Sequence, residues 1–143
     1  MEQMGQQAPP GRRGGTRRGD IEQGSAIAEF VMVSGLLLAV FASVLQLTLV
    51  LHVRNTLLDA AATGARYGTL ADRGPGDGAQ LTRELVSSAL SPRFASDVRA
   101  VSREIGGRQG LEISINTGLP LVGFFALGAE LRVTGEAVRY GGG

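Results

Sequence analysis

The chain has 143 residues, with 14 basic and 13 acidic side chains and a formal net charge of +1. A balance this close to neutrality argues against a protein that binds nucleic acid over its whole surface. Cysteine is absent, which excludes a disulfide framework and a thiolate metal site. Tryptophan is also absent and aromatic residues make up 5% of the chain, so a core must be mainly aliphatic.

Residues 1–23 are rich in Gly, Gln, Pro and Arg and nearly devoid of large apolar side chains. Such a segment cannot bury enough surface to offset its ordering entropy, so the sequence predicts a disordered leader. Basic residues are slightly more frequent before the following apolar stretch than after it: Arg12, Arg13, Arg17 and Arg18 against Arg54, Arg66 and Arg73. This excess favours a cytoplasmic N-terminus.

Residues 30–51 are uncharged and form the longest apolar stretch of the chain. As a helix they would extend roughly 33 Å, enough to cross a bilayer core of about 30 Å. Proline is absent from residues 53–71, where apolar and small residues recur at helical spacing. We therefore expect one helix of about 45 residues, with residues 25–53 in the membrane.

Two stripes of small residues occur at intervals of four, a spacing that lets another helix approach closely. The first lies in the span and comprises Gly35, Ala39 and Ser43, and the second comprises Ala60, Gly64 and Gly68. An alternative for the second stripe is that its glycines merely loosen the helix end.

Residues 72–78, DRGPGDG, predict the end of this helix. Residues 79–91 then favour a short amphipathic helix with Leu81, Leu85 and Ala89 on one face and Val86 and Leu90 beside them.

Residues 94–116 predict a hairpin in which residues 111–116 alternate apolar and polar, and residues 106–110 form the turn. Residues 98–105 fit either a strand or a helix. Residues 130–140 predict a last strand, and a change of apolar phase across Gly135 indicates a bulge there. The uncharged residues 119–129 are too short to span a bilayer, and could be a loop over the core, an interfacial patch or a partner surface.

The predicted class is α+β: a single N-terminal transmembrane helix that extends out of the membrane, then a short helix and an antiparallel sheet of about three strands. Residues 1–24 would be a cytoplasmic leader, residues 25–53 the transmembrane helix, and residues 54–143 a small extracytoplasmic domain. The only histidine, His52, lies at the edge of the span, and no phosphate-binding loop, zinc-protease motif or nucleophile elbow occurs. We expect no enzyme activity, cofactor, metal, small-molecule substrate or nucleic acid partner.

The segment Gly24–Phe30, GSAIAEF, resembles the processing motif of type IV pilins, in which a prepilin peptidase cuts after the glycine on the cytoplasmic side. A second G-x-x-x-x-E match begins at Gly107 but has neither a basic leader nor an apolar helix beside it. Placement therefore gives the motif its specificity. Classical pilins carry Phe as the first mature residue, whereas Ser25 occupies that position here.

The wider stretch resembles the TadE family of pilin-like proteins of the Tad machinery, which builds Flp pili. Glu29-Phe30 occupies the acid–aromatic pair that enters the span, and Asp59–Tyr67, DAAATGARY, the Ala/Gly-rich helix end. The resemblance implies a pseudopilin or minor pilin with a pilin-like fold. It also implies the membrane lipid, a prepilin peptidase, other pilins or pseudopilins and the Tad assembly platform as partners, with links to secretion and adhesion.

Glu29 also stands out on physical grounds, because a carboxylate at mid-span costs about 2.5–3.5 kcal/mol and less near the interface. In an assembled pilus the α-amine of a neighbouring subunit would neutralise it and fix the axial register. The alternative is an interfacial acid that reaches water.

Two other functions remain open. The chain would be an uncleaved single-pass membrane scaffold, or a secreted binding module cut near Ala60-Ala61-Ala62. The uncharged stretch exceeds the usual 7–15 residues of a signal peptide, which counts against the second. We expect a single-pass protein with its N-terminus in the cytoplasm and its C-terminal domain outside.

Overall fold

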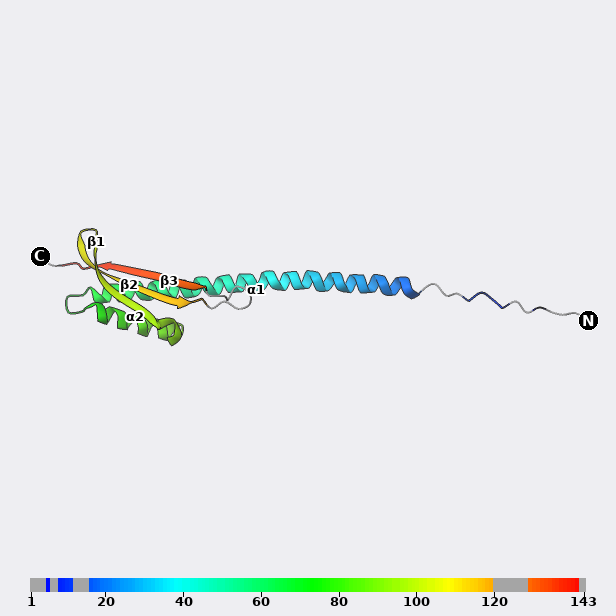
Figure 1. The fold of residues 1–143 in the computed structure, drawn as a ribbon, viewed down its shortest axis with the longest axis horizontal. Coiled ribbons are helices and arrows are strands. Elements are labelled where there is room, and N and C mark those ends of the chain that lie inside the picture. Colours follow the sequence, from blue (N-terminus) through cyan, green and yellow to red (C-terminus); the bar gives the residue numbers. More distant parts are fainter. Residues whose placement is uncertain (1–4, 6–7, 12–15, 120–128, 142–143) are drawn as a thin grey trace, which may run out of the picture. The chain divides into compact units, whose positions relative to one another are not determined.

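The computed structural model of the chain describes residues 5, 8–11, 16–119 and 129–141. In chain order the elements are helix α1 (Thr16–Gly68), helix α2 (Pro75–Ala89), the 3-10 helix η1 (Pro92–Ala95) and strands β1 (Asp97–Ile105), β2 (Arg108–Gly118) and β3 (Glu130–Val138) (Figure 1). The strands form one antiparallel sheet in the order β1-β2-β3. The predicted α+β class is confirmed.

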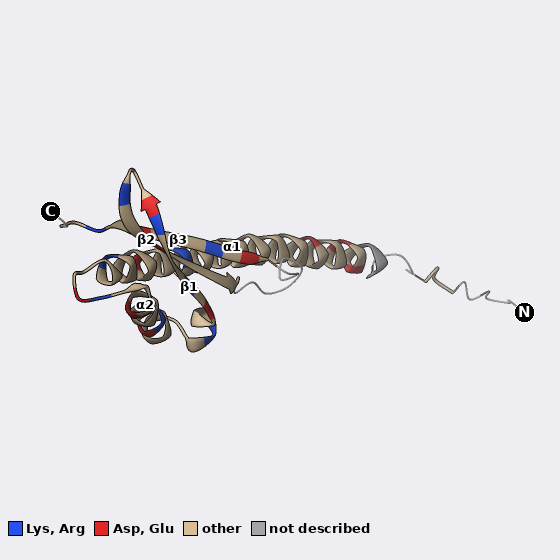
Figure 2. Cartoon of the chain, turned by 60° about the vertical axis from the view of Figure 1, so that its left-hand side comes forward, with Lys and Arg blue, Asp and Glu red and all other residues tan. Residues whose placement is uncertain are grey.

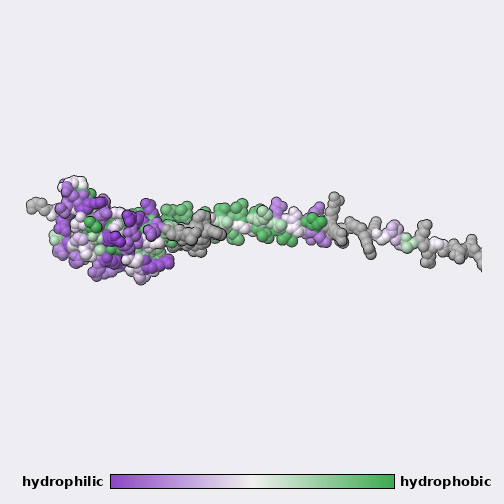
Figure 3. All heavy atoms as spheres, in the orientation of Figure 1, coloured by the Kyte–Doolittle hydropathy of each residue, from purple (hydrophilic) through white to green (hydrophobic). Residues whose placement is uncertain are grey.

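Helix α1 has 53 residues. Among the described residues, its part from Gly19 to Gly68 is the one helix long and apolar enough to cross a membrane, with a mean hydropathy of 2.3 over its most apolar 18-residue window. Only 6% of that window is buried within the chain, and Figure 3 shows its apolar side chains on the surface. Length and composition thus suit α1 to membrane anchoring.

The N-terminal boundary of α1 differs from the predicted one. The helix begins at Thr16, so residues 16–23 are helical although the sequence predicts disorder there. Extending a formed helix by one residue costs far less than nucleating a new one, and the apolar stretch supplies the nucleus. The leader's composition alone does not show this.

The break after α1 is also shorter than predicted. The first helix ends at Gly68, and the last four residues of the DRGPGDG run form the first turn of α2. Pro75 occupies the first helical position, where its missing N–H has no helical partner to lose. The Asp77 carboxylate accepts a hydrogen bond of 2.8 Å from the backbone N–H of Gly74 and so caps the helix.

The buried face of α2 is not the predicted leucine face. Its buried residues are Gly78, Ala79, Thr82 and Val86, whereas Leu81 and Leu85 are half-buried and Ala89 is exposed. Small residues face α1 because the two helices approach closely, which leucines at the crossing would prevent.

The β1–β2 hairpin is confirmed, and residues 98–105 are a strand, not a helix. The turn is shorter than predicted and consists of Gly106 and Gly107, with φ angles of +58° and +80°. Two positive φ angles in a two-residue loop match the right-handed twist of the strands.

Strand β3 contains no bulge, so that prediction is wrong. Its register with β2 runs without interruption through Ile115↔Val133 and Ile113↔Gly135 to Leu111↔Ala137. Gly135 is buried because β3 crosses α1 there: a Cβ atom on it would lie 2.5 Å from Ala62 N and 2.8 Å from Ala61 O. The glycine therefore permits a close approach of strand to helix.

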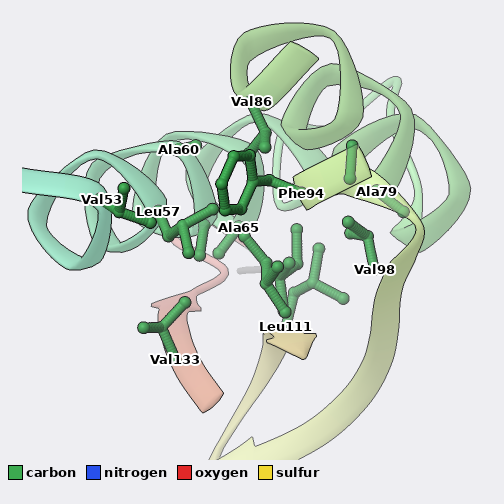
Figure 4. Packing of buried hydrophobic residues seen from close by; sticks show 14 residues of the cluster. Val53, Leu57, Ala60, Ala65, Ala79, Val86, Phe94, Val98, Leu111 and Val133 are labelled. Atoms are coloured by element: carbon green, nitrogen blue, oxygen red, sulfur yellow. The ribbon is translucent and has the colours of Figure 1, made fainter. Parts of the chain in front are cut away.

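The core lies between the sheet and two helices, the C-terminal part of α1 and α2 (Figure 4). The predicted alternation in β2 is confirmed, since Leu111, Ile113 and Ile115 are 2%, 0% and 0% exposed. Leu57 of α1 and Val86 of α2 are equally buried, with Phe94 and Val133 at the margins. The outer face of the sheet carries charged residues of both signs (Figure 2).

Residues 119–129 are described only at their two ends. The backbone N–H of Leu119 donates a hydrogen bond of 2.9 Å to the carbonyl oxygen of Ala129 and continues the β2–β3 ladder by one pair. Residues 120–128 lie outside the described part of the chain, and so do Arg12 and Arg13 of the leader.

Candidate functional site

The predicted processing segment lies within α1. Gly24, Ser25 and Glu29 are exposed, and a Cβ atom on Gly24 would meet no described atom within 4 Å. Ser25 and Glu29 are four residues apart, so they share one face of the helix with their Cβ atoms about 6 Å apart. The described residues do not cover this face of the helix.

Apolar side chains flank Glu29 on the same stretch of α1. Ile27 is 64% exposed and Phe30 is 72% exposed. Gly35, Ala39 and Ser43, the first small-residue stripe, are also exposed, and a Cβ atom on Gly35 would meet no described atom within 4 Å. This part of α1 suits an apolar environment supplied by lipid or by other helices.

The second small-residue stripe is covered within the chain. Ala60 is 5% exposed, and a Cβ atom on Gly64 would lie 2.6 Å from the carbonyl oxygen of Gly78 in α2. A Cβ atom on Gly68 would lie 3.0 Å from the carbonyl oxygen of Gly74 and would clash with Leu111 of β2. The helix that this stripe admits is thus α2 of the same chain.

In the segment Asp59–Tyr67, the residues of α1 that α2 and β3 cross are alanines and a glycine. This segment follows the uncharged part of α1, which begins after Glu29. The family model named TadE-like protein matches the chain over this stretch. Residues 24–66 are TadE-like. No curated protein and no solved structure is significantly similar to the chain.

The predicted family resemblance is therefore confirmed on these residues, which include the predicted processing motif, the predicted span and most of the Ala/Gly-rich helix end. The TadE-like family is one of structural pilus components rather than enzymes, and the match on residues 24–66 suggests an association with the Tad pilus.

The end of the TadE-like segment combines buried small residues with exposed polar ones. Ala61 and Ala65 are fully buried, whereas Asp59 and Arg66 are exposed. Tyr67 follows directly, and the Arg73 guanidinium lies 4.8 Å from its ring centroid. A guanidinium over an aromatic face is attractive, so this contact holds the end of the α1–α2 connection against α1.

Among the described residues, no group of three or more His, Cys, Asp or Glu side chains is placed to hold a metal ion. His52 is exposed, and its backbone carbonyl accepts a hydrogen bond of 2.9 Å from the Thr56 hydroxyl.

A polar row across the sheet was not predicted from the sequence. Asp97, Asn116 and Arg132 are aligned in register on the three strands. Asn116 Nδ2 donates to Asp97 over 3.0 Å, and Arg132 Nε donates to Asn116 Oδ1 over 2.7 Å. Asn116, followed by Arg99 at 2.9 Å, lowers the pKa of Asp97 because both donate to its ionised form. These three residues are far apart in the sequence, so the row can be recognised only once the register of the strands is known.

The sequence also did not predict that Gly78 and Gly135 make close backbone contacts with α1. Each lies opposite small residues of α1, at Gly64 and at Ala61–Ala62. In the sequence, each of these positions is visible only as a glycine inside a helical or an alternating pattern. A helix break or a bulge would produce the same pattern.

Proposed function

We propose that the chain is a TadE-like pseudopilin or minor pilin of Tad pilus biogenesis, cut after Gly24 by a prepilin peptidase and assembled through its first helix. The observation that carries this proposal is that Gly24, Ser25 and Glu29 are all exposed at the entrance of an uncharged helical stretch within the TadE-like segment. The N-terminus would be cytoplasmic and the sheet domain extracytoplasmic.

Cleavage after Gly24 would require local unwinding, because the scissile bond lies inside α1. Proteolysis acts on locally opened backbone rather than on intact helix. Gly19 and Gly24 lower the cost of opening the first turns of α1, since each glycine is less favourable in a helix than alanine by about 1 kcal/mol.

Processing would change the surroundings of Glu29. Ser25 would become the N-terminus and carry a free α-amine, and Glu29 would lie near the start of the helix, where the helix dipole favours an acid. The carboxylate would then meet a positive amine on its own face or on a neighbouring subunit. Pairing with a neighbour would fix the axial register between subunits.

N-terminal sequencing of the membrane-extracted protein tests the processing step. We expect Ser25 as the first residue. An intact leader would favour the uncleaved scaffold, and a start near Thr63 the secreted module. Gly24→Phe should block processing, whereas Gly19→Phe, a control in the same leader, should leave a mature band of normal size. A normal band from Gly24→Phe contradicts the proposal.

Glu29→Ala tests the register role. We expect normal membrane insertion but loss of assembled pili, because the positive amine would have no partner. Glu22→Ala is the matched control, since that acid would be removed with the leader. Pili at normal levels in the Glu29→Ala strain would refute the role of Glu29.

A further inference from the structure

The described residues leave one face of the C-terminal part of α1 uncovered. Helix α2 covers Gly64, and β3 lies against Ala61. The exposed residues on the other side of the helix are His52, Asp59, Thr63 and Arg66. At about 100° of rotation per residue, these four lie within an arc of about 60°. We call them the open face of α1.

Charged and ionisable side chains recur along the open face at intervals of seven residues. His52, Asp59 and Arg66 follow one another at this interval, which is close to two helical turns and corresponds to a rise of about 10.5 Å. The side chains of Asp59 and Arg66 make no hydrogen bond or ion pair with the described part of the chain. Both charges are therefore available to a partner.

A groove beside the open face gives a second helix room to approach. Asp59 and Thr63 of α1 line a cavity of about 250 Å³ together with Leu85 and Ala89 of α2. Leu85 is half-buried and Ala89 is exposed, so apolar surface borders the charged residues. A helix laid along the open face would remove this surface from water.

Two copies of the chain complement each other along this face only when one is shifted. Copies anchored in one membrane have parallel α1 helices. At equal level, Asp59 would face Asp59 of the second copy and Arg66 would face Arg66, so like charges would repel. If the second copy is shifted outward by seven residues, its Asp59 lies level with Arg66 and its His52 lies level with Asp59. Electrostatic complementarity therefore selects the shifted arrangement.

We propose that the open face of α1 binds the open face of a second copy, shifted along the helix by about 10.5 Å. Asp59 of the second copy forms an ion pair with Arg66, and its His52 donates a hydrogen bond to Asp59. The same charges keep copies at one level in the membrane apart, so the pair forms when one copy moves outward during assembly. The contact deepens the assembly step of the proposed function, and its role in a pilus rests on that function.

Disulfide formation between single-cysteine variants measures the shift, because the chain contains no cysteine. Thr56 and Thr63 are seven residues apart, so position 56 of the shifted copy lies level with position 63. We expect full-length Thr56→Cys and Thr63→Cys chains, mixed in dodecyl maltoside micelles, to form the mixed disulfide several-fold more than either symmetric one. Equal yields, or a yield no higher than that of Thr63→Cys with Gln80→Cys on the exposed side of α2, would overturn the proposal.

Charge reversal in the same cysteine variants tests the ion pair. Asp59→Arg and Arg66→Asp should each lower the yield of the mixed disulfide several-fold. The double variant should restore most of it, since opposite charges meet again. Glu104→Arg, at an exposed acid of β1, makes the same change in net charge as Asp59→Arg and should leave the yield unchanged. A double variant as low as the single ones would show that Asp59 and Arg66 do not pair.

Pili on the producing cells separate this contact from processing. We expect Asp59→Arg to reduce assembled pili several-fold and the double variant to restore them, with Ser25 as the first residue in both. A loss of pili that the double variant does not reverse would mean that a different subunit occupies the face, and would contradict the pairing of two copies. Normal pairing in micelles by a chain that keeps its leader in the membrane would overturn the processing step and support the contact.

Discussion

Gly135 of β3 lies against the backbone of Ala61 in α1, so closely that a Cβ atom on the glycine would be 2.8 Å from the Ala61 carbonyl oxygen. Ala61 is itself fully buried. The contact joins the sheet to the TadE-like segment and explains why both positions have little or no side chain.

Gly135→Ala should therefore destabilise the domain by about 1–3 kcal/mol, because neither backbone can move aside without disturbing the core. Amide hydrogen exchange at Ile113 and Ile115 measures the free energy of opening. Gly118→Ala is the control, since a Cβ atom there meets no described atom within 4 Å, and it should change this energy by less than about 0.5 kcal/mol. Equal effects of the two substitutions would show that the contact is looser than described.

The crossing of α1 and α2 offers a matched pair within one helix. A Cβ atom on Gly78 would lie 2.6 Å from the carbonyl oxygen of Gly64, whereas one on Gly76 would meet no described atom within 4 Å. Gly78→Ala should lower the thermal midpoint by several degrees, as expected for a loss of about 1–3 kcal/mol. Gly76→Ala should be neutral or stabilise by up to about 1 kcal/mol through helix propensity. A stabilising Gly78→Ala would exclude the close crossing.

The hairpin turn tests backbone conformation rather than packing. Gly106 has a φ angle of +58°, which asparagine adopts readily and valine does not. Gly106→Asn should retain native stability, whereas Gly106→Val should lose about 1–2 kcal/mol. Exchange of the β1 amides in the two variants distinguishes these outcomes, and equal protection would argue against a positive φ angle.

Asp97 should contribute to the pH dependence of folding. Its folded pKa is lowered, so its contribution is present above the unfolded pKa of about 3.9 and is lost as the pH falls through the folded value. Asp97→Asn should therefore be less stable than the natural chain at pH 7, and the difference should vanish in acid. Thermal unfolding between pH 7 and pH 2 measures it. A difference that persists at pH 2 would show that the ionised carboxylate of Asp97 is not its source.

Much of the secondary structure follows from the sequence, because local patterns determine it. The alternation in residues 111–116 correctly predicts the buried face of β2. The uncharged residues 30–51, followed by the proline-free residues 53–71, correctly predict one long helix there. The TadE-like resemblance also came from residues contiguous along one helix, from Gly24 onward. Whether Gly24 is a cut site and Glu29 a register residue remains a prediction.

Only the tertiary structure decided the roles of the interior glycines. Taken alone, Gly135 indicated a bulge and the Gly64–Gly68 pair indicated a loose helix end or a helix partner. The folded chain brings Gly135 to Ala61 and Gly64 to Gly78, pairs that are far apart in sequence. The row from Asp97 through Asn116 to Arg132 likewise exists only once the strands are in register. Because glycine has no side chain, it contributes nothing to a hydrophobic pattern in the sequence. The need for a glycine becomes clear only when the structure shows another backbone in the space that a side chain would fill.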